Sequence, residues 1–314
     1  MNLQQMRYVL EVARCGLNVS EAAVALHTSQ PGVSRQIRVL EEELGVAVFV
    51  RQGKRLTGVT VPGREILKIA ARMLQDVDNL RGVGREYSNE LSGSLSIATT
   101  HTQARYVLPQ VIQQFMRRYP GVRVSLHQGS PTQICAYVLG GEADIAIATE
   151  AIGEQEGLVM LPCYQWNRCV IAPPRHPLLK ARPLTLEEVA KYPIITYDHA
   201  FAGRSQINRA FAARGLSPNV VLTAIDADII KTYVALGLGV GIVAAMAYQE
   251  KADRGLRALD ASHLFESATT RIGVVKNAYL RGYAYAFIEL FAPQLTRRAV
   301  EAALSGDEGS DPGL

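Results

Sequence analysis

Residues 18–51 read NVSEAAVALHTSQPGVSRQIRVLEEELGVAVFVR, and this stretch decides the fold of the first part of the chain. Three alanines within residues 22–25 predict a short helix, because their small side chains let another helix approach closely. Asn18 and Ser20 are both candidates for its N-cap, since the side-chain oxygen of either accepts a free N–H of the first turn. The segment therefore predicts a helix that packs tightly against its neighbour.

A second helix is predicted to begin directly after the turn at residues 26–28. Ser29 is a good N-cap, and Pro31 loses no hydrogen bond in the first turn because that N–H has no partner within the helix. The expected buried stripe consists of Val33, Ile37, Leu40 and Leu44. The opposite face near the start carries Gln30, Ser34, Arg35 and Arg38. Short polar groups with arginines are typical of a recognition helix, because they reach base edges and phosphates in the major groove of DNA.

Residues 44–57 predict two short strands joined by a turn at Gly53. Arg51, Lys54 and Arg55 lie around this turn and make it a basic wing. A small helical domain with a solvated, charged hairpin is the alternative interpretation. The ordered set of helix, turn, capped helix and wing favours a winged helix-turn-helix within residues 1–59. The contacts expected with double-stranded DNA are Ser29, Gln30, Pro31, Ser34, Arg35, Arg38, Arg51, Lys54 and Arg55.

The same residues resemble the N-terminal pattern of the LysR-type transcriptional regulators. The matching motifs are Ser29-Gln30-Pro31-Gly32-Val33-Ser34-Arg35 and Leu44-Gly45, followed by Phe49-Val50-Arg51. The length of 314 residues also fits that family from end to end. The resemblance implies a DNA-binding regulator that senses a small effector with its C-terminal part and contacts RNA polymerase.

Residues 60–90 predict a long linker helix that begins at the Thr60 cap. Its apolar residues alternate four and three positions apart, at Ile66, Ala70, Met73, Val77, Leu80, Gly84 and Tyr87. Such a heptad seam is typical of helices that pair along one side, so we expect this helix to join two chains. Gly82 and Gly84 weaken the helix near its end and predict a hinge there. The family resemblance further implies that two such homodimers assemble into a homotetramer.

From Ser94 onward the pattern changes to repeated strand-helix-strand units, which predict mostly parallel sheets. Two groups of such units favour an α/β effector domain of two Rossmann-like lobes, of the periplasmic-binding-protein type, with a ligand cleft between them. We expect this domain over residues 91–304, with lobe I at about 91–163 plus 268–304 and lobe II at about 164–267. The tail at residues 305–314 contains acidic, Gly, Ser, Pro and Leu residues and is expected to be disordered.

Polar residues gather where predicted strands of the first lobe end. Thr99, Thr100, Thr102 and Gln103 follow one strand, and Thr149 ends a neighbouring strand. Because the carboxyl ends of parallel strands meet at one edge of a sheet, these residues are expected to lie close together. Hydroxyl, amide and backbone N–H groups in such a place favour an anion. The alternative is that the threonines cap helices and bind nothing.

Within the LysR-type regulators, long stretches resemble the members that control sulfur assimilation and cysteine synthesis. The matching stretches are residues 99–106, 127–133, 161–164, 166–168, 203–205 and 226–228. The resemblance implies acetylserine as the inducer, with sulfate or thiosulfate as competing anions. The effector-binding residues that it implies are Thr100, Thr102, Gln103, Thr149, Trp166, Ala202 and Gly203. Those regulators carry threonine where this chain has Ala202, so a regulator that senses another sulfur metabolite stays open as an alternative.

Bulk composition is a weaker guide to function. The formal charge is only +4, from 33 Lys+Arg against 29 Asp+Glu. The argument for a polyanionic partner therefore depends on where the charges lie along the chain and not on their sum. The first residues lack the basic and apolar regions of a secretory signal. The uncharged stretch between Lys231 and Glu250 is interrupted by glycines, which argues against a membrane helix. We therefore expect a cytoplasmic protein without membrane contact.

Four scattered cysteines, Cys15, Cys135, Cys163 and Cys169, form no CxxC pair and predict free thiols rather than a metal site. His101 is the one catalytic candidate, and a histidine of the cleft wall is the preferred interpretation because no catalytic motif accompanies it. We expect no enzyme and no cofactor. A solute-binding protein is the rival from a different class, and it predicts a secretion signal and no helix-turn-helix.

Overall fold

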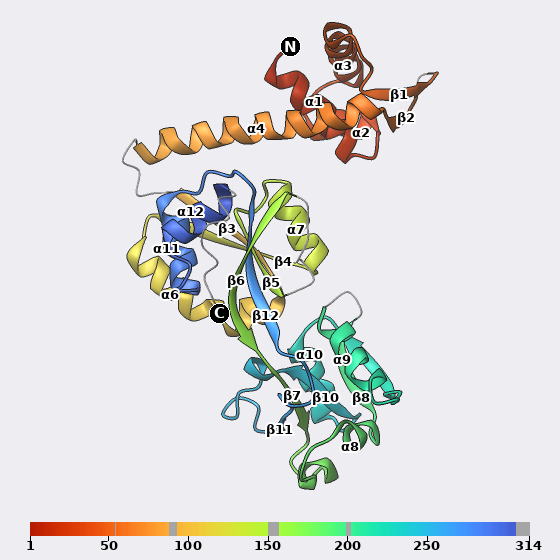
Figure 1. The fold of residues 1–314 in the computed structure, drawn as a ribbon, viewed down its shortest axis with the longest axis vertical. Coiled ribbons are helices and arrows are strands. Elements are labelled where there is room, and N and C mark those ends of the chain that lie inside the picture. Colours follow the sequence, from red (N-terminus) through yellow and green to blue (C-terminus); the bar gives the residue numbers. More distant parts are fainter. Residues whose placement is uncertain (54, 88–92, 150–156, 199–201, 306–314) are drawn as a thin grey trace. The chain divides into compact units, whose positions relative to one another are not determined.

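The computed structural model describes residues 1–53, 55–87, 93–149, 157–198 and 202–305. It divides into two compact units, Met1–Ser88 and Asn89–Leu314 (Figure 1). None of the helices in these described ranges is long and apolar enough to cross a membrane.

The N-terminal unit consists of three short helices, a hairpin and one long helix. Its elements are α1 (Leu3–Arg14), α2 (Val19–Ala25), α3 (Gln30–Leu44), β1 (Phe49–Gln52), β2 (Arg55–Val59) and α4 (Val61–Tyr87). Asn18 rather than Ser20 caps α2, because its side chain accepts two backbone N–H groups of the first turn. Ser29 caps α3 and Pro31 lies in its first turn, as predicted.

Helix α3 holds the small domain together through one buried face. Val33, Ile37 and Leu40 are buried in the core that α1, α2 and the hairpin share. Leu44 was expected in the same stripe but is 37% exposed. The reason is local, since α3 ends at this residue and Gly45 turns the chain away with a left-handed φ of 70°.

The first half of α4 packs on the core of its own unit. Ala70 is fully buried, and Ile66 packs against the same core together with Leu67 and Leu74. The predicted seam is therefore wrong for Ile66 and Ala70, because these side chains are used within one chain. Leu80, further along the helix, is 72% exposed.

The end of α4 also differs from the expected hinge. The helix runs through both glycines to Tyr87 without a break. Residues 88–90 of the expected linker lie outside the described residues.

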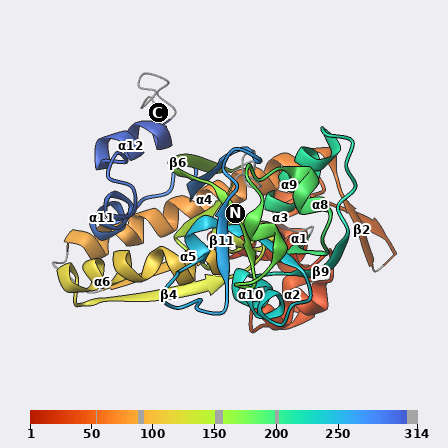
Figure 2. The same cartoon turned by 90° about the horizontal axis from the view of Figure 1, so that it is seen from below.

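Lobe I of the C-terminal unit is built on a five-stranded sheet with the order β4-β3-β5-β12-β6. Its strands are β3 (Gly93–Thr99), β4 (Val122–Gln128), β5 (Ile145–Thr149), β6 (Leu158–Trp166) and β12 (Ala268–Val275). Its helices are α5 (His101–Tyr106), α6 (Leu108–Arg118), α7 (Pro131–Leu139), α11 (Gly282–Phe291) and α12 (Arg297–Ser305). Helix α11 packs beside α6 and α12 (Figures 1 and 2), with the Phe287 and Phe115 rings 5.5 Å apart.

Lobe II is built on a second five-stranded sheet, with the order β11-β7-β10-β8-β9. Its strands are β7 (Arg168–Ala172), β8 (Ile194–Tyr197), β9 (Val220–Ala224), β10 (Val240–Ala244) and β11 (Arg257–Asp260). Its helices are α8 (Leu186–Ala190), α9 (Ala202–Ala212) and α10 (Ala227–Ala235), with 3-10 turns η2 (Pro177–Lys180) and η3 (Ala245–Ala247).

Both sheets are mixed rather than mostly parallel. In lobe I, β3 runs parallel to β4 and β5, whereas β12 runs antiparallel to β5 and β6. In lobe II, β8 runs parallel to β9 and β10, whereas β7 runs antiparallel to β10 and β11. The antiparallel strands are β12 in lobe I and β7 in lobe II. The chain enters lobe II through β7, directly after β6, and it returns to lobe I through β12.

The lobe boundaries also shift slightly. Strand β6 continues to Trp166, which pairs with Ala268, so lobe I extends beyond the expected residue 163. The pairing with β12 along the whole of β6 explains the extension. At the other end, α12 includes Ser305, and residues 306–314 of the expected tail lie outside the described residues.

Candidate functional site

A small cavity is lined by residues of both lobes of the C-terminal unit. Lobe I contributes Thr100, His101, Thr102, Gln103, Pro131, Thr149 and Trp166, and lobe II contributes Tyr197, Ile225 and Ala244. The cavity lies where β3 and β5 end, as the strand order predicts for a ligand site. Among these lining residues none carries a carboxylate, and the hydroxyl and amide groups of the wall can donate hydrogen bonds to a ligand.

Two threonines at the start of α5 present hydroxyls to the cavity. Thr100 is the N-cap residue of α5, yet its side chain makes no capping hydrogen bond. This argues against the interpretation that it merely caps a helix. Thr102 forms a hydrogen bond with the Tyr197 hydroxyl of lobe II, which helps to offset the effect of burial that raises the pKa of Tyr197. Because α5 has only six residues, its dipole adds little, and the side chains carry the polarity of this wall.

Two side-chain hydrogen bonds hold Gln103 in place in the cavity wall. Its side chain is 1% exposed, and its Nε2 donates to the Thr270 hydroxyl at 3.1 Å. The Tyr164 hydroxyl donates to its Oε1 at 2.5 Å. Burial raises the pKa of Tyr164, so the phenol stays protonated as a donor. One amide proton of Gln103 remains after these bonds.

Trp166 forms the wall at the point where the chain passes from β6 into β7. Its indole Nε1 is shielded from solvent and has no hydrogen-bond partner among the described residues. The Arg168 guanidinium lies 5.2 Å from the ring centre. Arg168 is 1% exposed and donates to Gln206 and to the Glu266 carbonyl. The buried Arg168 guanidinium therefore places a positive charge next to the indole ring.

The other residues predicted for the site differ in where the structure places them. Thr99 does not face the cavity, because its fully buried hydroxyl donates to the Ile147 carbonyl at 2.9 Å. Ala202 and Gly203 begin α9, directly after residues 199–201, which lie outside the described residues. The wall residues Pro131, Tyr197, Ile225 and Ala244 were not predicted from sequence, because they belong to buried or apolar segments with no polar signature.

A polar cluster joins α5 of lobe I to α10 of lobe II beside the cavity. The Tyr106 hydroxyl donates to Asp228 at 2.6 Å, and Lys231 Nζ donates to Tyr106 at 2.7 Å. Lys231 Nζ also lies 3.0 Å from Asp228 and 3.1 Å from Asp253. We call Tyr106, Asp228, Lys231 and Asp253 the interlobe cluster.

The pKa values reflect the strength of this cluster. Burial and the hydrogen bond to Asp228 raise the pKa of Tyr106 to about 12. Burial alone would lower the pKa of Lys231, but its bonds to Tyr106, Asp228 and Asp253 raise it. Burial alone would raise the pKa of Asp228, but hydrogen bonds from Tyr106 and Lys231 outweigh burial and lower it. At neutral pH Lys231 is therefore a cation, Asp228 an anion and Tyr106 a neutral phenol.

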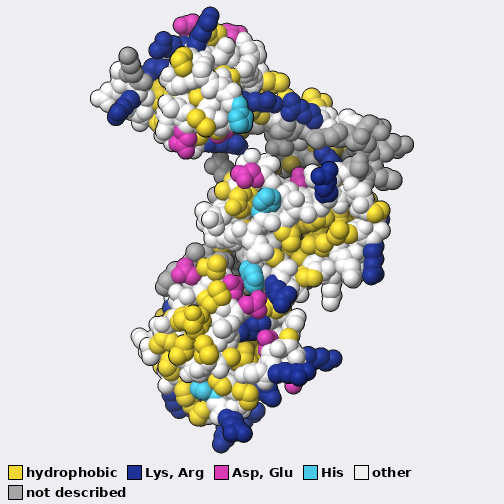
Figure 3. All heavy atoms as spheres, turned by 180° about the vertical axis from the view of Figure 1, so that it is seen from behind, with side chains coloured by type: hydrophobic (Ala, Val, Ile, Leu, Met, Phe, Trp, Pro, Cys, Tyr) yellow, Lys and Arg dark blue, Asp and Glu magenta, His cyan; other side chains and the backbone are white. Residues whose placement is uncertain are grey.

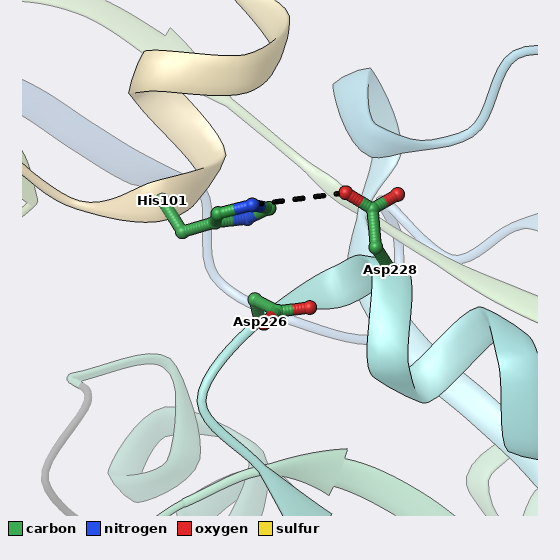
Figure 4. A group of neighbouring side chains, drawn as sticks. All are labelled: His101, Asp226 and Asp228. Carbon is green, nitrogen blue, oxygen red and sulfur yellow. Dashed lines mark ion pairs between the residues drawn. The ribbon is translucent and has the colours of Figure 1, made fainter. Parts of the chain in front are cut away.

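His101, Asp226 and Asp228 form a second group at the rim of the cavity (Figure 4). One ligand atom from each lies within 4.8 Å of the others. Asp228 already pairs with Lys231, and Asp226 accepts the Ile229 N–H at 2.8 Å as the N-cap of α10. A metal ion would compete with these bonds, so the group is better explained as a polar contact between lobes than as a metal centre.

The predicted DNA-contacting residues of the N-terminal unit are largely exposed, and Lys and Arg side chains are visible on its surface (Figure 3). Arg35, Arg38 and Arg55 are exposed. Gln30 Nε2 donates to Ser34 Oγ at 3.0 Å, which orders two polar groups at the start of α3. Lys54 lies outside the described residues.

Arg51 differs from the other basic residues of the wing. It forms an ion pair with Glu41 at 2.7 Å. The same carboxylate accepts the backbone N–H groups of Val48 at 2.9 Å and Phe49 at 3.2 Å. Arg51 therefore helps to fasten the wing to α3, a role that the sequence did not indicate.

All four cysteines are free. Cys135, Cys163 and Cys169 are buried, and burial raises the thiol pKa of Cys163 and of Cys169 to about 12. These thiols therefore stay protonated and behave as small apolar side chains.

Comparisons with known proteins agree with this architecture. Residues 3–64 match the family described as bacterial regulatory helix-turn-helix protein, lysR family, and residues 88–296 match the LysR substrate binding domain. The chain is 54% identical to the HTH-type transcriptional regulator CysB of Burkholderia cenocepacia, over 99% of both proteins. It is 55% identical to the regulator SsuR of the same organism, over 97% of this chain and 99% of that protein.

A solved structure supports the assignment of the C-terminal unit. The cofactor-binding domain of the Cbl transcriptional regulator aligns with a TM-score of 0.66 and 44% identity, covering 69% of this chain and 95% of that domain. With a matching helix-turn-helix, a matching effector domain and full-length relatives, the chain belongs to the LysR family of transcriptional regulators.

Proposed function

We propose that the chain regulates genes of sulfur assimilation and cysteine synthesis, and that its effector is an acetylserine bound in the interlobe cavity with sulfate or thiosulfate as competitors. The observation that carries the proposal is the wall of the cavity, in which Thr100, Thr102, Thr149 and the Gln103 amide converge without a carboxylate. Hydrogen bonds to a charged group are worth roughly 1.5–3 kcal/mol each, so such a wall favours a small anion over a cation.

A regulator that senses another sulfur metabolite is the second candidate. The feature in its favour is Ala202, at a position where the resemblance to the sulfur regulators implies a threonine. CysB and SsuR are equally similar relatives at 54% and 55% identity, so similarity alone does not choose between them. A solute-binding protein does not account for the helix-turn-helix at residues 3–64. We expect neither a cofactor nor catalysis at the cavity, and we place the protein in the cytoplasm.

The effector proposal predicts a thermal shift that depends on Thr102. Sulfate, thiosulfate, the acetylserines and adenylyl sulfate are each titrated while unfolding is followed by fluorescence. Thr102→Ala is expected to abolish the rise in Tm produced by sulfate, because it removes a hydroxyl of the cavity wall. Thr223→Ala, which removes an exposed hydroxyl on β9, is the matched control and should keep the full rise. An undiminished rise in Thr102→Ala would defeat the proposed site.

The DNA-binding proposal rests on the exposed face of α3. Arg35→Ala should weaken operator binding by about 5- to 150-fold at fixed salt, as expected for one phosphate or base contact of about 1–3 kcal/mol. Arg14→Ala, which removes an exposed arginine of α1, is the control for the same change in net charge. Fluorescence anisotropy with labelled operator DNA measures both. Equal affinities of Arg35→Ala and wild type would remove Arg35 from the contact set.

We propose that two chains pair to present two recognition helices to DNA. The exposed apolar residues of α4, Ile69 at 47% and Leu80 at 72%, support pairing through the part of the helix that the unit's own core does not use. Assembly of two homodimers into a homotetramer and contact with RNA polymerase are the expected further interactions.

A further inference from the structure

We infer that Glu41 is a positioning residue of the DNA interface, whose carboxylate sets the direction of the wing relative to the recognition helix α3. The wing is the hairpin of β1 and β2. This inference rests on DNA binding by the N-terminal unit, as proposed above, and it gives an acidic residue a function in a basic interface.

Glu41 lies on the face of α3 that carries the expected DNA contacts. It follows Gln30 by eleven positions, which make about three helical turns, so the two side chains leave the helix in nearly the same direction. Arg38, about one turn before Glu41, is exposed. A carboxylate on this face repels the phosphates of DNA. Its charge is therefore unfavourable for binding unless the protein itself uses it.

The structure shows that the carboxylate of Glu41 binds the wing. Its Oε1 accepts the backbone N–H groups of Val48 at 2.9 Å and Phe49 at 3.2 Å, where β1 begins. Its Oε2 pairs with Nη2 of Arg51 at 2.7 Å. Only 11% of the Glu41 side chain is exposed, and hydrogen bonds to a charged group are stronger than neutral ones. One side chain of α3 thus holds β1 at three points.

The direction of the wing depends on contacts at its base. The hairpin projects from the N-terminal unit (Figure 1), and among the described strands β1 and β2 pair only with each other. Phe49 packs the base into the core, but apolar packing has no preferred direction, whereas hydrogen bonds do. Because Arg55 lies opposite Gln52 of β1, bonds that orient β1 also orient this exposed arginine of the wing.

Substitution of Glu41 should weaken DNA binding even though it removes a negative charge. The probe is the labelled duplex that wild type selects from a pool of random sequences, and fluorescence anisotropy at fixed salt measures its affinity. Glu41→Ala is expected to bind about tenfold more weakly, because the wing loses its direction. Glu41→Gln should lose less, since its Oε1 still accepts the two N–H groups. Glu42→Ala, an exposed position of the same helix, is the control and should bind at least as tightly as wild type.

A double-mutant cycle separates positioning of the wing from general stability. In wild type, Arg55→Ala should weaken binding about fivefold or more, as expected for a lost phosphate contact. In Glu41→Ala the same change should cost less than about twofold, because Arg55 no longer reaches its phosphate. Arg35→Ala, at the start of α3, should cost the same factor in both backgrounds.

The outcomes keep the two proposals apart. If wild type selects no duplex, the DNA-binding proposal fails and the inference fails with it. If wild type binds and Glu41→Ala binds as tightly or more tightly, the inference alone is overturned. It is also overturned if Arg55→Ala keeps its full effect in Glu41→Ala. Loss of the Arg35 and Arg55 effects together overturns it as well, since that marks unfolding of the whole unit.

Discussion

Gly63→Ala is expected to unfold or severely loosen the N-terminal unit. A Cβ at this position would overlap the Val48 carbonyl oxygen, and it would lie 2.9 Å from the Val48 carbonyl carbon and 2.8 Å from Thr60 Oγ1. The Val48 backbone cannot easily move aside, because its oxygen accepts the Thr60 N–H at 3.0 Å and Val48 is fully buried. A clash that neither side can relieve costs about 3 kcal/mol or more.

The measurement is hydrogen exchange of peptides from residues 1–87, together with operator affinity. Gly84→Ala is the matched control, because it adds the same methyl group to the same helix and meets no atom within 4 Å. It should stabilise α4 by up to about 1 kcal/mol, since alanine is the better helix former. Wild-type exchange rates and operator affinity in Gly63→Ala would contradict the predicted clash.

Lys231→Met should be the most damaging single change in the C-terminal unit outside its apolar core. The Lys231 side chain is 11% exposed and that of Asp253 is 13% exposed, and their charges lie 3.1 Å apart. Methionine keeps the length of the side chain but leaves Asp253 buried without its cation. Removal of one partner of a buried ion pair costs about 3 kcal/mol, which in a unit of this size lowers the Tm by about 6–12 °C.

Trp166 is the single tryptophan of the chain, so its fluorescence follows unfolding of the C-terminal unit specifically. Lys191→Met is the control, because its ion pair with Glu188 is exposed and should contribute less than about 1 kcal/mol. The double variant Lys231→Met with Asp253→Asn should recover part of the loss, since no unpaired charge remains at Asp253. A Tm of Lys231→Met within one degree of wild type would show that the cluster does not stabilise the unit.

Local rules explain why the N-terminal unit was predictable. Ser29 and Pro31 define the start of α3 through bonds within one turn, and the short range of these bonds leaves little for tertiary structure to change. The heptad seam of α4 failed for Ile66 and Ala70 for the opposite reason. The same spacing of apolar residues is expected whether the helix packs on a second chain or on α1 of its own chain.

The candidate site was predictable on one wall only. Thr100 and Thr102 follow a strand and begin a helix, which is a visible signal, and the alternation of side chains along β3 turns Thr99 inward. Tyr197 and Ala244 end buried strands of the other lobe and carry no such signal. Tyr106 and Lys231 are 125 positions apart, so no local sequence pattern at either residue predicts their hydrogen bond.

The placement of β12 has a consequence for synthesis of the protein. This strand inserts between β5 and β6, and β6 pairs with no other described strand. While the ribosome has not yet released residues 268–275, β5 and β6 lack their shared partner and expose strand edges, which are sites of aggregation. Lobe I therefore completes its sheet only after the whole of lobe II has been translated. Although it begins first in the sequence, lobe I is thus the later of the two lobes to have all of its strands available, and its unpaired strand edges are exposed during that interval.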